Sequence, residues 1–221
     1  MVRDERRAPG RTIGYSVLGR SIRAYRVGRP GAKTAVLVVG EIHGNERAGE
    51  AVTRRLLGLQ PPARVALWIV PELNPDGARA NVRQNARGVD LNRNFGRRWR
   101  HVDHRGGTYW SGPHAFSEPE TRAARRLIRL IRPRISIWYH QHMALVDESG
   151  GDVRVERRYA RLVGLPARRL PRYPGTATRW ENHLIRRGTA FVVELPKGFL
   201  TYARARRHAR AVLRLARDAA G

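Results

Sequence analysis

Four short runs of apolar residues constrain the fold of this 221-residue chain more than any other feature. Each run has the length of a buried strand and ends at polar or turn-forming residues, and the segments between the runs include amphipathic helical patterns. Strands that are apolar on both faces and alternate with helices are typical of a sheet covered by helices on both sides. The sequence therefore predicts an α/β domain. The four runs are Thr34–Val39, Val65–Val70, Ile135–Tyr139 and Ala190–Val193.

The segments around these runs predict the remaining elements. Thr12–Val27 alternates and contains a turn near Gly19, which predicts a β-hairpin. Ser117 and Glu120 have the spacing of a capping box, so we expect them to start a helix that ends near Ile131. The sequence has no internal repeat and no linker, and we expect one domain over residues 1–221. Further helices are expected at about 47–57, 154–163, 178–187 and 202–219.

The charge of the chain is strongly positive, with a formal net charge of +26. Lys33 and Lys197 are the only lysines among 44 basic residues, and the arginines are spread over nearly every segment. This distribution favours a compositional bias toward arginine over a dedicated nucleic-acid surface. Nonspecific attraction to polyanions is still expected from a charge of this size.

Composition also limits the chemistry and the location of the chain. It has no cysteine, which excludes disulfides and thiolate ligands, so a bound metal must take nitrogen or oxygen donors. It has no run of about 18 apolar residues, and we expect no membrane span. Met1–Arg11 is basic with no apolar segment behind it, so there is no recognisable signal peptide and the expected location is cytoplasmic.

Candidate metal ligands follow the predicted strands. His43 and Glu46 come after the first strand, His140 and His142 follow the third, and Glu194 closes the fourth. Ligands bind beyond the carboxyl ends of strands in open α/β sheets, so these side chains should meet at one edge. Two histidines and a carboxylate are the donors of a catalytic zinc site, and a further glutamate can act as its base. Strand periodicity alone leaves either histidine of the second pair as the third ligand.

The polar stretch Ala78–Gly112 has no regular periodicity. So long a loop in a compact domain usually has a function. His101, His104 and His114 resemble a ligand cluster, but we expect them to lie on the surface.

Four ordered motifs resemble those of the zinc carboxypeptidase family. The resemblance implies a three-layer α/β/α fold with a mixed, mostly parallel sheet and one Zn²⁺. The ligand of this family directly follows an apolar strand, which favours His140 over His142. The motifs are His43-Gly44-Asn45-Glu46, Asn74-Pro75-Asp76-Gly77, Asp90-Leu91-Asn92-Arg93-Asn94-Phe95 and Phe191-Val192-Val193-Glu194.

The same resemblance implies a role for each site residue. Glu194 would activate a metal-bound water, and Arg83 would polarise the scissile carbonyl. Asn92, Arg93 and Tyr173 would bind the substrate, and Asp90 would orient one metal-binding histidine. The implied metal ligands are His43, Glu46 and His140.

The resemblance implies hydrolysis of a peptide or amide bond next to a free carboxylate. The compact chain looks most like the bacterial murein-peptide amidases, which cut the D-glutamyl–diaminopimelate bond of cell-wall peptides. One alternative is an N-acyl amino acid deacylase of the succinylglutamate desuccinylase and aspartoacylase type, although the Asn-Pro-Asp-Gly motif favours the peptidase side. Another is a catalytically inactive basic binding protein, which the presence of Glu194 and every expected ligand disfavours.

Overall fold

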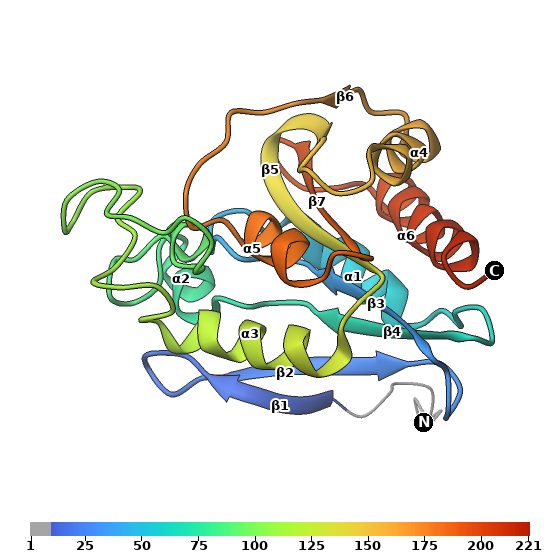
Figure 1. Cartoon of the computed structure of the whole chain (residues 1–221), viewed down its shortest axis with the longest axis horizontal. Coiled ribbons are helices and arrows are strands. Elements are labelled where there is room, and N and C mark those ends of the chain that lie inside the picture. The colour runs from blue at the N-terminus through green and yellow to red at the C-terminus, as the bar shows by residue number, and fades with distance from the viewer. Residues whose placement is uncertain (1–9) are drawn as a thin grey trace.

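A seven-stranded sheet forms the centre of the protein in the computed structural model, which describes residues 10–221 (Figure 1). The strand order is β1-β2-β4-β3-β5, and both β6 and β7 pair with β5. The basic segment Met1–Arg11 lies almost entirely outside the described residues. The strands are β1 Gly10–Tyr15, β2 Ser21–Val27, β3 Thr34–Val39, β4 Val65–Val70, β5 Ile135–Asp147, β6 Ala167–Arg168 and β7 Thr189–Pro196.

The sheet is mixed and mostly parallel, as expected. Strand β3 runs parallel to β4 and β5, and β5 runs parallel to β6 and β7. The predicted hairpin is present as β1 and β2, and it joins the sheet through an antiparallel pairing of β2 with β4. The carboxyl ends of β3, β4, β5 and β7 therefore point to the same edge of the sheet.

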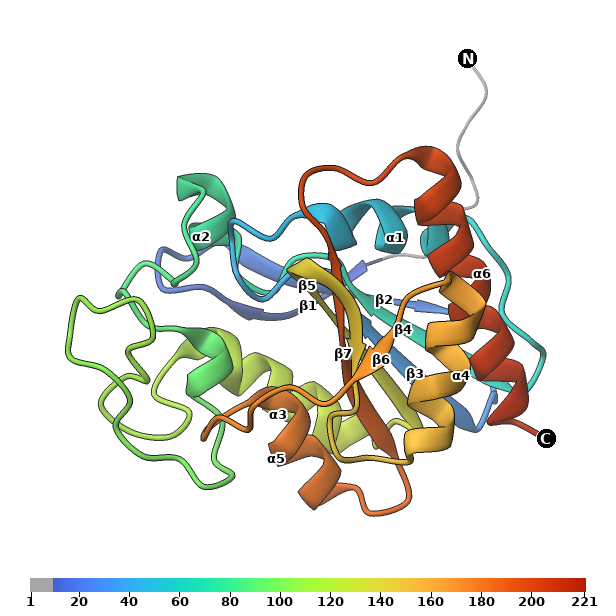
Figure 2. The same ribbon diagram turned by 90° about the horizontal axis from the view of Figure 1, so that it is seen from above.

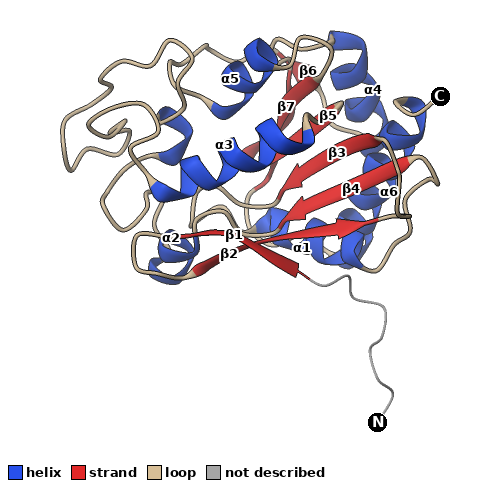
Figure 3. Ribbon diagram, turned by 60° about the horizontal axis from the view of Figure 1, so that its bottom comes forward, coloured by secondary structure: helices blue, strands red, loops and turns tan. Residues whose placement is uncertain are grey.

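Helices cover both faces of the sheet and form two outer layers (Figures 2 and 3). Alternate residues of β3 divide between the two cores: Val36 and Val38 pack with α1, α4 and α6, whereas Leu37 and Val39 pack with α3 and α5. The three-layer prediction is confirmed. No helix within residues 10–221 is long and apolar enough to cross a bilayer. The helices are α1 Ala48–Leu57, α2 Pro75–Ala80, η1 Leu91–Arg93, α3 Pro119–Ile131, α4 Val153–Val163, α5 Ala177–Leu184 and α6 Tyr202–Asp218.

The capping box expected at the start of α3 is wrong. Glu118, not Ser117, is the N-cap residue, and the Ser117 hydroxyl donates to Glu118 Oε1 at 2.7 Å. Glu120 points away from the helix start and accepts from the Val17 amide at 3.0 Å and from Asn85 Nδ2 at 3.1 Å. Asn94 Nδ2 also donates to the Ser117 hydroxyl at 2.8 Å. Both side chains that the local spacing would have paired therefore bond to distant loops instead.

A buried carboxyl group couples the stability of the fold to pH. Glu181 on α5 is 2% exposed and accepts hydrogen bonds from the Ser136 hydroxyl and from Trp138 Nε1, the latter at 3.1 Å. Burial raises the pKa of Glu181 to about 7 from an ordinary value of 4.5. The protonated Glu181 carboxyl therefore stabilises the fold fully below pH 4.5. This stabilisation is lost as the pH rises through about 7, because the carboxyl ionises at a lower pH in the unfolded chain than in the folded protein.

We expect Glu181→Gln to remove this loss. Glutamine can donate to the Ser136 hydroxyl and accept from Trp138 without carrying a charge. The free energy of unfolding of the variant, relative to wild type, should be higher at pH 8 than at pH 5 by on the order of 2–3 kcal/mol. Denaturant unfolding of variant and wild type at the two pH values measures this effect. If the variant and wild type differed in free energy of unfolding by the same amount at both pH values, Glu181 would not be the group that ionises in this range.

Candidate metal centre and substrate cleft

Three strands bring the candidate ligands to one edge of the sheet. His43 follows β3, and Glu46 lies just before the first turn of α1. His140 and Glu194 are register partners on the adjacent parallel strands β5 and β7. Register partners point to the same face of a sheet, so Glu194 stands beside His140. The expectation that these side chains would meet is confirmed.

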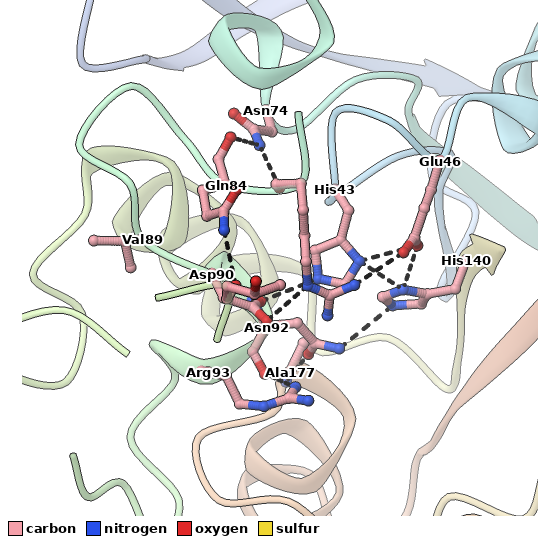
Figure 4. A network of polar contacts seen from close by, with 12 residues as sticks. His43, Glu46, Asn74, Gln84, Val89, Asp90, Asn92, Arg93, His140 and Ala177 are labelled. Carbon is pink, nitrogen blue, oxygen red and sulfur yellow. Dashed lines mark hydrogen bonds and ion pairs between the residues drawn. The ribbon is translucent and has the colours of Figure 1, made fainter. Parts of the chain in front are cut away.

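His43, Glu46 and His140 place three donor atoms around one point (Figure 4). Glu46 Oε2 lies 2.9 Å from Nδ1 of His43 and 2.9 Å from Nδ1 of His140, and the two Nδ1 atoms are 3.2 Å apart. All three residues are buried. His142, in contrast, is exposed, and the structure places it away from this group.

Asp90 fixes which nitrogen of His43 faces the group. Asp90 Oδ1 lies 3.1 Å from His43 Nε2 and also accepts from the Asn92 amide at 2.9 Å. Because a carboxylate only accepts, Nε2 carries the proton and the lone pair of Nδ1 points toward Glu46. This contact is the one that the predicted orienting role of Asp90 requires, and the same carboxylate also caps the following turn.

Arg83 connects the two carboxylates of the site. Its Nε donates to Asp90 Oδ2 at 2.9 Å, and its Nη1 donates to Glu46 Oε1 at 3.0 Å. Burial is the largest single effect and would raise the pKa of both carboxyl groups, but His43 together with His140 at Glu46, and His43 together with the arginines at Asp90, outweighs it. The pKa of each is held well below its usual range, so both groups stay ionised at neutral pH.

The Asn74-Pro75-Asp76-Gly77 motif shapes the backbone behind the ligands. Gly44 and Gly77 touch: a Cβ atom on Gly44 would lie 1.9 Å from the Gly77 carbonyl carbon, so no larger residue fits there. The motif opens α2, where Asn74 accepts from the Gly77 amide at 3.0 Å. Asn74 Nδ2 also donates to the backbone carbonyl of Arg83 at 3.3 Å, which holds the loop that presents this arginine.

Asn92 and Arg93 provide a cationic wall of the same site. Asn92 Oδ1 accepts from the Ala177 amide at 2.9 Å, which ties the segment to α5. Arg93 is 6% exposed; its Nη1 donates to the Asn92 carbonyl at 2.9 Å, and its Nε has no hydrogen-bond partner within residues 10–221. The guanidinium carbon lies 4.5 Å from the ring centre of Tyr173 and 5.6 Å from that of Tyr109.

A cleft of about 470 Å³ joins these groups. It is lined by the three candidate ligands, by Arg83, Asn92 and Arg93, and by Tyr173 and Glu194, so all the predicted site residues except Asp90 reach it. Glu194 is half-buried, and its Oε2 lies 3.5 Å from the Met143 amide. Asp90 lies behind His43, as expected for an orienting residue.

Sequence reasoning missed several parts of the site. Tyr109 lines the cleft between Arg83 and Arg93, and its position within the long polar loop was the only signal for it. Gln141 accepts from the Ala48 amide at 2.9 Å and donates to the Pro196 carbonyl at 2.9 Å, so it links α1, β5 and β7 next to the ligands. His101, His104 and His114 are exposed, as expected.

The three donor atoms fit a zinc ion. Tetrahedral zinc with bonds of about 2.0–2.1 Å separates neighbouring donors by roughly 3.3 Å. The separations of 2.9–3.2 Å between the three atoms are close to this value. Two imidazoles and one carboxylate are also the donor types of catalytic zinc sites with an open position. The fold and this group together define a mononuclear metallohydrolase architecture.

The chain belongs to the zinc carboxypeptidase family, whose model matches residues 5–59 and 62–156. Murein peptide amidase A of Escherichia coli K12 is 29% identical over 146 residues, which cover 61% of this chain and 60% of the relative. The match thus spans less than two thirds of that relative. Carboxypeptidase SOL1 of Arabidopsis thaliana is 36% identical over 100 residues, 38% of this chain and 20% of the relative.

Solved structures show the same fold over nearly the whole chain. Murein-tripeptide amidase MpaA from Escherichia coli O157 superposes with a TM-score of 0.78 at 25% identity, covering 98% of this chain and 96% of that one. Carboxypeptidase A from Helicoverpa armigera gives a TM-score of 0.80 at 19% identity, covering 98% of this chain and 69% of that one.

Proposed function

We propose that the chain is a zinc-dependent hydrolase of a peptide or amide bond adjacent to a free carboxylate. The convergence of His43, Glu46 and His140 in a cleft that also holds Glu194 and the buried cation Arg93 carries this proposal. One wall of the cleft thus offers three metal ligands and a base, and the other offers the guanidinium of Arg93, which can bind a carboxylate.

The roles of the side chains follow from these positions. His43, Glu46 and His140 would hold the zinc, which supplies a Lewis acid that polarises the scissile carbonyl and makes water a better nucleophile. Glu194 takes a proton from the attacking water and returns it to the leaving amine. Arg83 uses its remaining N–H groups to stabilise negative charge on the carbonyl oxygen.

The substrate is held by its terminal carboxylate. Arg93 can bind both carboxylate oxygens because its guanidinium is planar, and Asn92 lies beside it. Tyr173 is 49% exposed and stacks on Arg93, so it can cover the bound residue.

We propose a murein-derived tripeptide as the substrate. Besides Arg83 and Arg93, two further arginines, Arg172 and Arg179, line the cleft. Arg172 is held by Asp147 at 3.0 Å, while burial and the neighbouring arginines lower the pKa of Arg179, which reflects a locally positive field. Such a field favours a terminal residue with a second carboxylate in its side chain, as in diaminopimelate. The likeness to murein peptide amidase A supports the same substrate.

Zinc content of paired histidine variants tests the metal centre. We expect about one zinc per wild-type chain and little in His140→Ala, because a three-ligand site that loses one donor binds weakly. His142→Ala is the matched control: it removes an exposed histidine two residues away and should keep its zinc. Mass spectrometry of metal content measures both, and equal zinc in the two variants would contradict the proposed ligand.

Release of the terminal residue from a murein tripeptide tests the substrate. The zinc-loaded wild-type protein should release this residue. An analogue of the tripeptide with an uncharged side chain on its terminal residue should be cut more slowly. N-acyl amino acids serve as comparison substrates, because preferential cleavage of these would indicate a deacylase instead.

A further inference from the structure

We propose that Glu41, Glu50 and Glu72 form a second cation site, for a hard divalent ion such as calcium, separate from the zinc centre. Glu41 follows β3, Glu50 lies in the first turn of α1, and Glu72 follows β4. None of the three is among the residues of the described chain that line the cleft.

The three carboxylates are close enough to bind one cation. Each glutamate offers one oxygen, and these oxygens all lie within 4.8 Å of one another. Hard divalent cations such as calcium take carboxylate and water oxygens as ligands. Water can complete the coordination on the partly exposed side formed by Glu50 and Glu72.

The burial of Glu41 independently supports a cation at this site. Glu41 is 0% exposed, and neither of its carboxyl oxygens has a hydrogen-bond partner anywhere in residues 10–221. The other buried carboxylates of this region differ: Glu46 accepts from Arg83 and from the Gln141 amide, and Asp90 accepts from Arg83 and from the Asn92 amide. A buried carboxylate without donors is costly, and two neighbouring acids add to that cost. A cation directly offsets both effects.

Nearby arginines do not take this role. Arg47 Nε pairs with Glu50 Oε1 at 2.7 Å, and Arg54 Nη2 approaches Glu50 Oε2 at 3.9 Å. Both contacts are made to Glu50, the member of the group on the helix. Glu41, at the buried end of the site, has no hydrogen-bond partner within residues 10–221, and Arg47 acts on it only through longer-range attraction.

A cation at this site would hold three elements together. It would join the end of β3, the end of β4 and the first turn of α1, next to the existing bond from the Leu73 amide to the Glu41 carbonyl at 2.9 Å. His43 lies two residues after Glu41, so the same ion would stabilise the segment that carries the zinc ligands. The proposal itself does not depend on the proposed hydrolase activity, because its measurements are binding and stability.

Calcium binding to the full chain, loaded with one equivalent of zinc, tests the proposal at pH 7.5. Equilibrium dialysis should find one calcium per chain, and Tm should rise by about 5–10 °C at a calcium concentration 100 times Kd. Glu41→Gln and Glu72→Gln should each weaken calcium binding at least tenfold, whereas the surface control Asp152→Asn should bind like wild type.

Two results would overturn the cation site. One is a zinc-loaded wild type that binds no calcium at millimolar concentration, which would mean that the three acids share protons instead. The other is calcium binding that neither glutamine variant weakens. Glu41→Gln removes an unpaired buried charge, and Glu72→Gln changes a partly exposed side chain, so at least one folded variant is expected for the comparison.

Discussion

Replacing Glu194 with glutamine should lower kcat by about 10²–10⁴-fold while the zinc remains bound. Glutamine keeps the size of the side chain and can still accept from the Met143 amide, but it cannot take a proton from water. Glu194 is not one of the three residues whose donor atoms converge, so the metal should stay in place. The expected loss is therefore in the chemical step and not in the assembly of the site.

Two measurements separate this outcome from misfolding. Zinc content and Tm of Glu194→Gln should match wild type, and Glu148→Gln, which changes a surface carboxylate paired with Arg157, should retain full kcat. An unchanged kcat in Glu194→Gln would remove Glu194 as the base and leave the cleft without an assigned proton acceptor. Loss of zinc together with activity would instead make Glu194 a ligand.

The site residues form a chain of alternating charge within a strongly basic protein. Glu46 lies between Arg83 and the two histidines, and Asp90 lies between Arg83 and His43. Each carboxylate is thus buried next to partners that keep it ionised, which is the condition for a buried charge to be tolerated.

The sequence was sufficient to predict the central strands because burial on both faces leaves a simple pattern. Strands β3 and β4 begin and end at the residues expected from their apolar runs. The length of strand β5 was underestimated, since residues 141–144 of its second half are exposed or half-buried and only residues 145–147 are buried again. Strand β6 has only two residues, and pairing with β5 defines it. Tertiary pairing, which no local pattern contains, decides such elements.

The site residues also divide into those that local sequence patterns predict and those that depend on tertiary contacts. His43, Glu46 and Glu194 could be found from their positions after apolar runs, and the structure brings them together. Strand periodicity left His140 and His142 open, and the family resemblance favoured His140. The register of β5 against β7 places His140 opposite Glu194. Tyr109 and the contacts of Glu118 and Glu120 with Asn85 depend on how the loop from 78 to 118 folds back, and no periodicity predicts that path.

Arg93→Gln should reduce kcat/KM for a substrate with a free terminal carboxylate by roughly 30- to 1000-fold, equivalent to about 2–4 kcal/mol. Burial lowers the pKa of Arg93, and its Nε has no partner within the described chain, so this cation is poised to bind a carboxylate from the substrate. The same substitution should not reduce Tm, because it removes a buried charge that the folded chain does not pair through Nε. Arg87→Gln, in the same loop but exposed, is the matched control and should leave kcat/KM unchanged.

The carboxylate itself can be varied to show that Arg93 acts on it. Wild type should cut the free acid much faster than the same peptide with a terminal carboxamide, since the amide leaves the buried guanidinium without its charged partner. In Arg93→Gln this preference should largely disappear, so the effects of the two changes should not add. If the variant discriminated between acid and amide as strongly as wild type does, the carboxylate would have to bind elsewhere, and Arg172 and Arg179 would become the next residues to test.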